Sequence, residues 1–136
     1  MRAHATTTEP ILPSPIPARL NLFLLYVADP LASVAFYQRL LDREPLDAFP
    51  SYAAFALEGG HTLGLWASHR VSPPPPVSGH RSEVAFTVAD DDAVRGLHAH
   101  WQTLGVPIEQ PPVAEVFGLT FVALDPDGHR IRVCPR

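Results

Sequence analysis

Two stretches of the chain share one pattern of apolar, β-favouring residues that ends on the same short motif. Residues 22–29 and 83–90 are both largely apolar, and both close on Val-Ala-Asp. The two aspartates, Asp29 and Asp90, lie 61 residues apart. Each is placed to cap a following helix, and Pro30 suits the first helical position because its missing N–H would have no partner there. The pattern predicts two copies of one strand-and-helix unit.

Apolar residues at helical spacing follow each aspartate. They form two stripes, Leu31, Val34, Ala35 and Leu41 in the first copy and Val94, Leu97, Trp101 and Leu104 in the second. Trp101 is therefore expected in the core rather than at a binding surface. Gly105 is expected to end the second helix.

Strand-like runs follow each predicted helix, at residues 52–57, 62–66, 119–124 and 130–134. Each final hairpin contains a Gly-His step, which in the second copy follows the turn sequence Asp-Pro-Asp. The order of strand, helix and two or three antiparallel strands therefore occurs twice. This order predicts an α+β fold of two tandem βαβββ modules rather than a doubly wound parallel sheet.

Proline marks the predicted boundaries, because many of the 16 prolines concentrate before residue 18, at 73–76 and around 107–112. We interpret residues 1–18 as a flexible tail and 19–136 as a single domain. Within it, module one spans 19–70, a polyproline-type connector 71–79 and module two 80–136. A chain of 136 residues can bury one core without disulfides or a structural metal.

Composition narrows the range of partners. A formal net charge of -4 with only 10 basic residues argues against a nucleic-acid partner. No apolar run approaches the roughly 20 residues that span a bilayer, so no membrane partner is expected. The one cysteine, Cys134, excludes an internal disulfide. With an N-terminus unlike a signal peptide, these features predict a cytoplasmic protein.

Two motifs carry a resemblance to a known superfamily. Val-Ala-Asp-Pro-x-x-Ser-x-x-Phe-Tyr at 27–37 and Asp-Pro-Asp-Gly-His at 125–129 resemble the glyoxalase/bleomycin-resistance/extradiol-dioxygenase proteins, the vicinal oxygen chelate superfamily. The resemblance covers about residues 20–136. It implies the glyoxalase/bleomycin resistance fold.

Metal-dependent members of that superfamily place ligands in the first and last strand of each half. Carried onto this chain, those positions are Leu22, Gly64, Glu83 and Arg132. Leucine and glycine offer no donor and a guanidinium repels a cation, so we expect no metal, no cofactor and no metal catalysis. The resemblance also implies that Glu83 and Arg132 lie close together, where a salt bridge would take the vacated place. Two charges on separate solvated faces are the alternative.

The seven histidines offer no substitute metal site. His98 and His100 are two residues apart on a predicted helix and point to different faces. The others lie in the tail, after turn glycines or beside the connector. We expect all of them to be exposed or singly hydrogen-bonded.

The C-terminal sequence resembles one group within the superfamily. Val-Phe-Gly-x-Thr-Phe and Asp-Pro-Asp-Gly-His-x-Ile-Arg-Val-Cys-Pro, within residues 116–135, are similar to phenazine antibiotic resistance proteins. The resemblance implies binding and sequestration of a small planar aromatic antibiotic without covalent chemistry, by a homodimer with pockets between its subunits. A metal-dependent lyase or dioxygenase, and a fold used only for protein association, are the alternatives.

Planar ligands are held by aromatic faces and a few polar groups. We predict a ligand site, without catalytic residues, because no Ser-His-Asp order, Cys-His pair or phosphate loop is present. Trp66 leads the candidates, since it ends a strand before the polar residues 68–70 and so favours a cavity rim. Phe55 and Phe121 fit the core equally well. The predicted site comprises Trp66, Phe49, Tyr52, Phe55 and Phe117, with Glu83 and Arg132 orienting the polar edge of the ligand.

Overall fold

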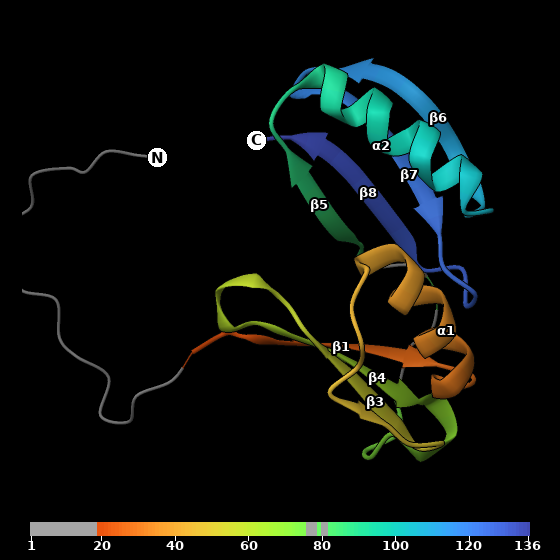
Figure 1. Ribbon diagram of the computed structural model, residues 1–136. Coiled ribbons are helices and arrows are strands. Elements are labelled where there is room, and N and C mark those ends of the chain that lie inside the picture. The colour runs from red at the N-terminus through yellow and green to blue at the C-terminus, as the bar shows by residue number, and fades with distance from the viewer. Residues whose placement is uncertain (1–18, 76–78, 80–81) are drawn as a thin grey trace, which may run out of the picture.

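Two modules lie one above the other, each a four-stranded sheet with one helix against it (Figure 1). The computed structural model describes residues 19–75, 79 and 82–136. The predicted tail at 1–18 lies outside the described residues, as do residues 76–78 of the predicted connector and the first two residues, 80–81, of the predicted second module.

The strand orders of the two sheets are β1-β4-β3-β2 and β5-β8-β7-β6. In each module the first strand is parallel to the last, and the remaining pairs are antiparallel. The predicted fold of two tandem βαβββ modules is confirmed.

The elements of the first module fall within residues 22–70. They are β1 (Leu22–Val27), α1 (Pro30–Leu41), β2 (Asp47–Ala48), β3 (Tyr52–Ala56) and β4 (Thr62–Ala67), with short 3₁₀ turns η1 (Glu58–Gly60) and η2 (Ser68–Arg70). The second module comprises β5 (Val84–Val88), α2 (Asp91–Thr103), β6 (Ile108–Glu115), β7 (Gly118–Leu124) and β8 (Arg130–Pro135).

Both helices begin where the two aspartates predict. The Asp29 carboxylate accepts a hydrogen bond from the backbone N–H of Leu31 at 3.1 Å, and Asp90 does the same for Ala93 at 2.8 Å. Helix α2 ends at Thr103, and Gly105 follows with a φ of 77°, a conformation that glycine adopts without strain. The predicted caps and the predicted stop are confirmed.

The buried face of α1 differs from the predicted stripe. Leu31 and Ala35 are exposed, and the buried face is formed by Pro30, Ser33, Val34, Phe36, Tyr37 and Leu40. Positions 33, 36, 37 and 40 follow the three- and four-residue spacing of one helix face. The prediction was wrong at Leu31 and Ala35 because the two aromatic residues, Phe36 and Tyr37, set which face turns inward.

The prolines near residue 110 lie inside a strand. The sequence predicts a boundary at this cluster, but β6 includes Pro111 and Pro112. The strand pairs with β7 alone, so it is an edge, and its register shifts between Ile108 and Gln110 and again between Gln110 and Val113. An edge strand tolerates proline because the missing N–H need not join a ladder.

One hydrophobic core joins both modules. Trp101 is 1% exposed, and its ring lies 5.3 Å from the ring of Phe86 and 5.4 Å from that of Phe121, centroid to centroid. Phe55 and Phe121 are fully buried. The prediction that Trp101 belongs to the core is confirmed, and the open question about Phe55 and Phe121 is settled in favour of the core.

The 125–129 turn of module two binds the end of β1 in module one. Asp127 Oδ1 accepts a hydrogen bond from the backbone N–H of Ala28 at 2.7 Å. Nε2 of His129 donates to the backbone carbonyl of Tyr26 at 2.9 Å. The turn therefore fixes β1 relative to the second sheet.

Candidate functional site

An open hollow of about 470 Å³ lies on the first sheet. It is lined by Leu22, Leu24, Ser51, Tyr52, Trp66 and Arg70, and we call these six residues the aromatic hollow. Along β4 the neighbours of Trp66, Leu65 and Ala67, are fully buried. Because side chains alternate along a strand, Trp66 faces away from the core that α1 covers. The hollow therefore occupies the sheet face opposite the helix.

Three aromatic side chains stand in a row across this face. Tyr52 of β3 is directly opposite Trp66 of β4, and Tyr26 of β1 is opposite Trp66 on the other side. The rings of Tyr26 and Trp66 meet edge to face, with centroids 6.4 Å apart and planes at 81°. Sequence reasoning missed Tyr26. Its place two residues after Leu24, on the same strand face, was the signal that could have found it.

The missing side chain of Gly64 leaves room for the side chains of Leu24 and Tyr52, which line the hollow. A Cβ atom at this position would lie 2.6 Å from Cδ2 of Leu24 and 2.7 Å from the hydroxyl oxygen of Tyr52. Both distances are shorter than van der Waals contact allows. Any larger residue here, a metal ligand included, would displace Leu24 and Tyr52.

The remaining predicted aromatic residues lie elsewhere. Phe55 is 0% exposed and packs in the core, so we correct its assignment to the ligand site. Phe49 is exposed in the turn between β2 and β3, and Phe117 is exposed in the turn between β6 and β7. Neither lines the aromatic hollow. Of the five predicted aromatic residues, the structure brings together Trp66 and Tyr52.

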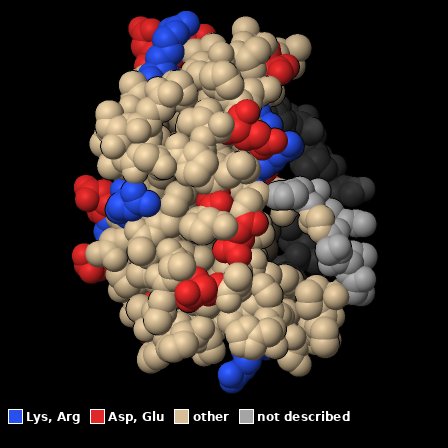
Figure 2. All heavy atoms as spheres, turned by 90° about the vertical axis from the view of Figure 1, so that its right-hand side faces the viewer, with Lys and Arg blue, Asp and Glu red and all other residues tan. Residues whose placement is uncertain are grey.

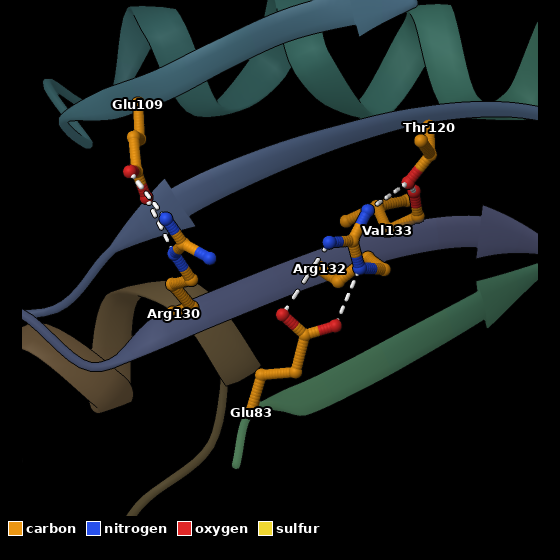
Figure 3. A network of polar contacts seen from close by, with 6 residues as sticks. All are labelled: Glu83, Glu109, Thr120, Arg130, Arg132 and Val133. Carbon is orange, nitrogen blue, oxygen red and sulfur yellow. Dashed lines mark hydrogen bonds and ion pairs between the residues drawn. The ribbon is translucent and has the colours of Figure 1, made fainter. Parts of the chain in front are cut away.

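Glu83 and Arg132 form the predicted ion pair (Figure 3). Nε of Arg132 donates to Oε1 of Glu83, and its Nη2 lies 3.4 Å from Oε2. The same guanidinium reaches the hydroxyl of Thr120 at 3.3 Å, and that hydroxyl donates to the backbone carbonyl of Val133 at 2.7 Å. The alternative of two separately solvated charges is therefore excluded.

A second arginine and glutamate pair lies beside the first on the same sheet (Figure 3). Arg130 donates to both carboxylate oxygens of Glu109, at 2.9 and 2.8 Å. The hydrogen bond and the charge of Glu109 raise the pKa of Arg130. Arg130 and Arg132 help to line a hollow of about 250 Å³ in module two. Glu83 and Arg132 thus lie outside the aromatic hollow of the same chain.

The four positions that correspond to the metal ligands of the superfamily do not suit a divalent ion. Leu22 and Gly64 have no donor side chain, and the Glu83 carboxylate is already paired with the Arg132 guanidinium. Within residues 19–75, 79 and 82–136, no three His, Cys, Asp or Glu side chains converge as a metal site would require. The residues present therefore do not fit the metal of the enzymatic relatives.

Charge and hydropathy add two observations. The face shown in Figure 2 carries scattered basic side chains, most of them beside acidic ones, rather than a continuous basic patch. In the described part of the chain, no helix is both long and apolar enough to cross a membrane.

Known proteins share the sequence pattern and the fold of this chain. Residues 19–133 match the model of the Glyoxalase/Bleomycin resistance protein/Dioxygenase superfamily. The chain is 32% identical over 118 residues to the phenazine antibiotic resistance protein EhpR of Enterobacter agglomerans, covering 85% of this chain and 90% of that protein.

Solved structures are similar to this chain in fold. A protein from Agrobacterium tumefaciens, determined by solution NMR, is 40% identical with a TM-score of 0.77, over 88% of this chain and 98% of that one. A lactoylglutathione lyase from Agrobacterium tumefaciens is 22% identical with a TM-score of 0.66, over 88% and 94% of the two chains, and shares the fold. The chain belongs to the glyoxalase/bleomycin resistance protein/dioxygenase superfamily.

Proposed function

We propose that this protein binds a planar aromatic antibiotic, such as a phenazine, and confers resistance by sequestering it without chemical change. The observation that carries the proposal is the row formed by Tyr26, Trp66 and Tyr52 beside an apolar hollow. Identity of 32% to a phenazine antibiotic resistance protein supports the same class of ligand.

The size and lining of the aromatic hollow suit such a ligand. Its volume of about 470 Å³ falls within the ~300–1,000 Å³ of small-molecule sites. Flat polycyclic compounds gain from contact with aromatic rings beyond the burial of their area. Leu22 and Leu24 supply an apolar floor beside Tyr52 and Trp66.

The proposal includes a homodimer. The hollow is open, and the neighbouring strand β1 exposes Leu22, Phe23, Leu24 and Tyr26. An apolar surface of this kind favours covering by a second protein surface. A second copy of the chain would enclose the ligand and bury these side chains.

The proposal also includes the absence of catalysis and a cytoplasmic location. The positions that bind the metal in metal-dependent relatives cannot hold a Lewis-acidic metal ion in this chain. They carry a leucine, a glycine and the ion pair of Glu83 and Arg132. Cys134, the one cysteine, is half-buried at the end of β8, which suits a packed side chain better than a nucleophile. A single cysteine also fits a reducing compartment.

A thermal-shift screen with product analysis tests the proposal. Phenazine at about 100 times its Kd should raise the Tm by about 5–10 °C, because only the folded protein binds it. Zn²⁺, Ni²⁺ and Fe²⁺ should leave the Tm unchanged. Chromatography should recover the phenazine unaltered. Stabilisation by a metal, together with conversion of the compound, would instead establish the metal-dependent lyase or dioxygenase.

A further inference from the structure

One cationic side chain lines the otherwise uncharged aromatic hollow. Arg70 ends the 3₁₀ turn that follows β4, four residues after Trp66. The other lining residues are two leucines, a serine, a tyrosine and a tryptophan, so no carboxylate of the lining opposes the guanidinium. The local field of the hollow therefore favours an anion.

Most other arginines of the described chain already have partners. The side chains of Arg19, Arg39, Arg43, Arg95, Arg130 and Arg132 each donate a hydrogen bond to a carboxylate or a backbone carbonyl. Within the described residues, the side chains of Arg70 and Arg136 have no such partner. Of these two, Arg70 alone lies at the hollow.

The residue type adds to the argument. All 10 basic residues of the sequence are arginines. A guanidinium is planar and presents paired N–H donors that match a carboxylate in a bidentate geometry. A free guanidinium beside an aromatic ring is thus suited to a flat ligand whose acidic group projects from the edge of the ring system.

We propose that the aromatic hollow selects planar aromatic ligands that carry an anionic group, a carboxylate above all, and that Arg70 is the residue that binds this group. The inference rests on the proposed function, because it assumes that a planar ligand occupies the hollow. Tyr52 and Trp66 bind the ring system, and Arg70 sets the preference for charge.

The test compares two ligands of nearly equal shape by isothermal titration calorimetry. Phenazine-1-carboxylate is an anion at neutral pH, and phenazine-1-carboxamide is its neutral counterpart. The wild-type protein should bind the carboxylate about fivefold more tightly than the amide, the upper range for a solvent-exposed ion pair. Added salt should reduce this ratio, because it screens exposed charges.

Arg70→Gln should bring the ratio of the two affinities close to one, because it should weaken binding of the carboxylate more than binding of the amide. Arg136→Gln is the matched control. It removes the other arginine of the described residues whose side chain has no partner, at a position that does not line the hollow, and it should keep the wild-type ratio. Equal wild-type affinities, or an Arg70→Gln variant that loses both ligands equally, would overturn the selection for charge while leaving the proposed function intact. Failure of the wild-type protein to bind either compound would overturn the proposed function and this inference with it.

Discussion

The hydroxyl of Tyr37, in the middle of α1, donates a hydrogen bond of 2.8 Å to the carboxylate of Asp125, in the turn between β7 and β8. The two residues are 88 positions apart and belong to different modules. Asp125 is 4% exposed, and its other oxygen accepts from the backbone N–H groups of Asp127 and His129. A buried carboxylate is thus satisfied by its own turn and by a phenol of the other module.

Loss of that phenol should weaken the fold. Tyr37→Phe leaves one buried oxygen of Asp125 without its donor, at a cost of about 1–3 kcal/mol in the free energy of unfolding. Tyr26→Phe is the control, because Tyr26 is exposed and its hydroxyl makes no hydrogen bond within the described residues. Urea denaturation measures the free energy of unfolding of both variants. Equal stability of the two variants would show that the inter-module bond contributes nothing.

Tyr37 should also give the stability a pH dependence in the alkaline range. Burial, and then the nearby charge of Asp125, raise the pKa of Tyr37. Above about pH 10, the usual phenol pKa, the unfolded chain releases this proton and the folded protein keeps it. Unfolding therefore becomes more favourable as the pH rises, whereas below that value Tyr37 has no effect. Between neutral and alkaline pH, the free energy of unfolding should fall more steeply for the wild type than for Tyr37→Phe. Parallel curves of this free energy against pH would contradict the prediction.

The two tryptophans should respond oppositely to truncation. Trp101→Ala opens a cavity between α2 and β7 and should lower the free energy of unfolding by roughly 3–5 kcal/mol. Trp66→Ala removes a half-buried side chain at an open hollow and should cost clearly less. Denaturant titration of both variants decides the matter. A larger loss at Trp66 would mean that its indole is part of the core.

The two arginine and glutamate pairs of the second sheet should differ in strength. A double-mutant cycle on Glu83 and Arg132, with glutamine at each position, should give a coupling energy of about 0.5–3 kcal/mol. The pair of Glu109 and Arg130 is more exposed, at 37% and 46% against 31% and 24%, and should couple more weakly and lose more in salt. Coupling energies that are equal for the two pairs, and that fall equally in salt, would contradict this difference.

The apolar strand β1 should mediate dimerisation. Leu24→Glu places a charge on its exposed face and should convert a dimer mass into a monomer mass in light scattering. Leu31→Glu is the matched control, because Leu31 is a similarly exposed leucine on α1. A wild-type monomer at micromolar concentration, or equal effects of both substitutions, would remove the dimer from the proposal.

The duplicated pattern made the fold predictable, whereas the site was predictable in part. The paired aspartates, the Gly-His steps and strand-like runs define local structure, and local structure is what a short sequence window encodes. Tyr52 and Phe55 are three residues apart on one strand, so alternation places them on opposite faces. The prediction that both residues line one site was therefore wrong at Phe55, which lies in the core.

Other features of the site depend on contacts distant in the sequence. The bond between Tyr37 and Asp125 and the contact of His129 with the Tyr26 carbonyl join segments that no local pattern connects. The position of Arg70 at the aromatic hollow follows from the register of β1, β3 and β4. The ion pair of Glu83 and Arg132 could be predicted, because the resemblance to the superfamily implies that these two positions lie close together.

The most direct test of the central proposal is the affinity of the Trp66→Ala variant for phenazine, measured by calorimetry and by quenching of tryptophan fluorescence. Loss of stacking and of buried indole area should weaken binding at least about tenfold, which corresponds to ~1.4 kcal/mol. Trp101→Phe, a conservative change in the core, should keep the wild-type affinity. If Trp66→Ala binds phenazine as tightly as the wild type and its fluorescence is quenched as fully, the ligand does not occupy the aromatic hollow, and the proposed function of this site is contradicted.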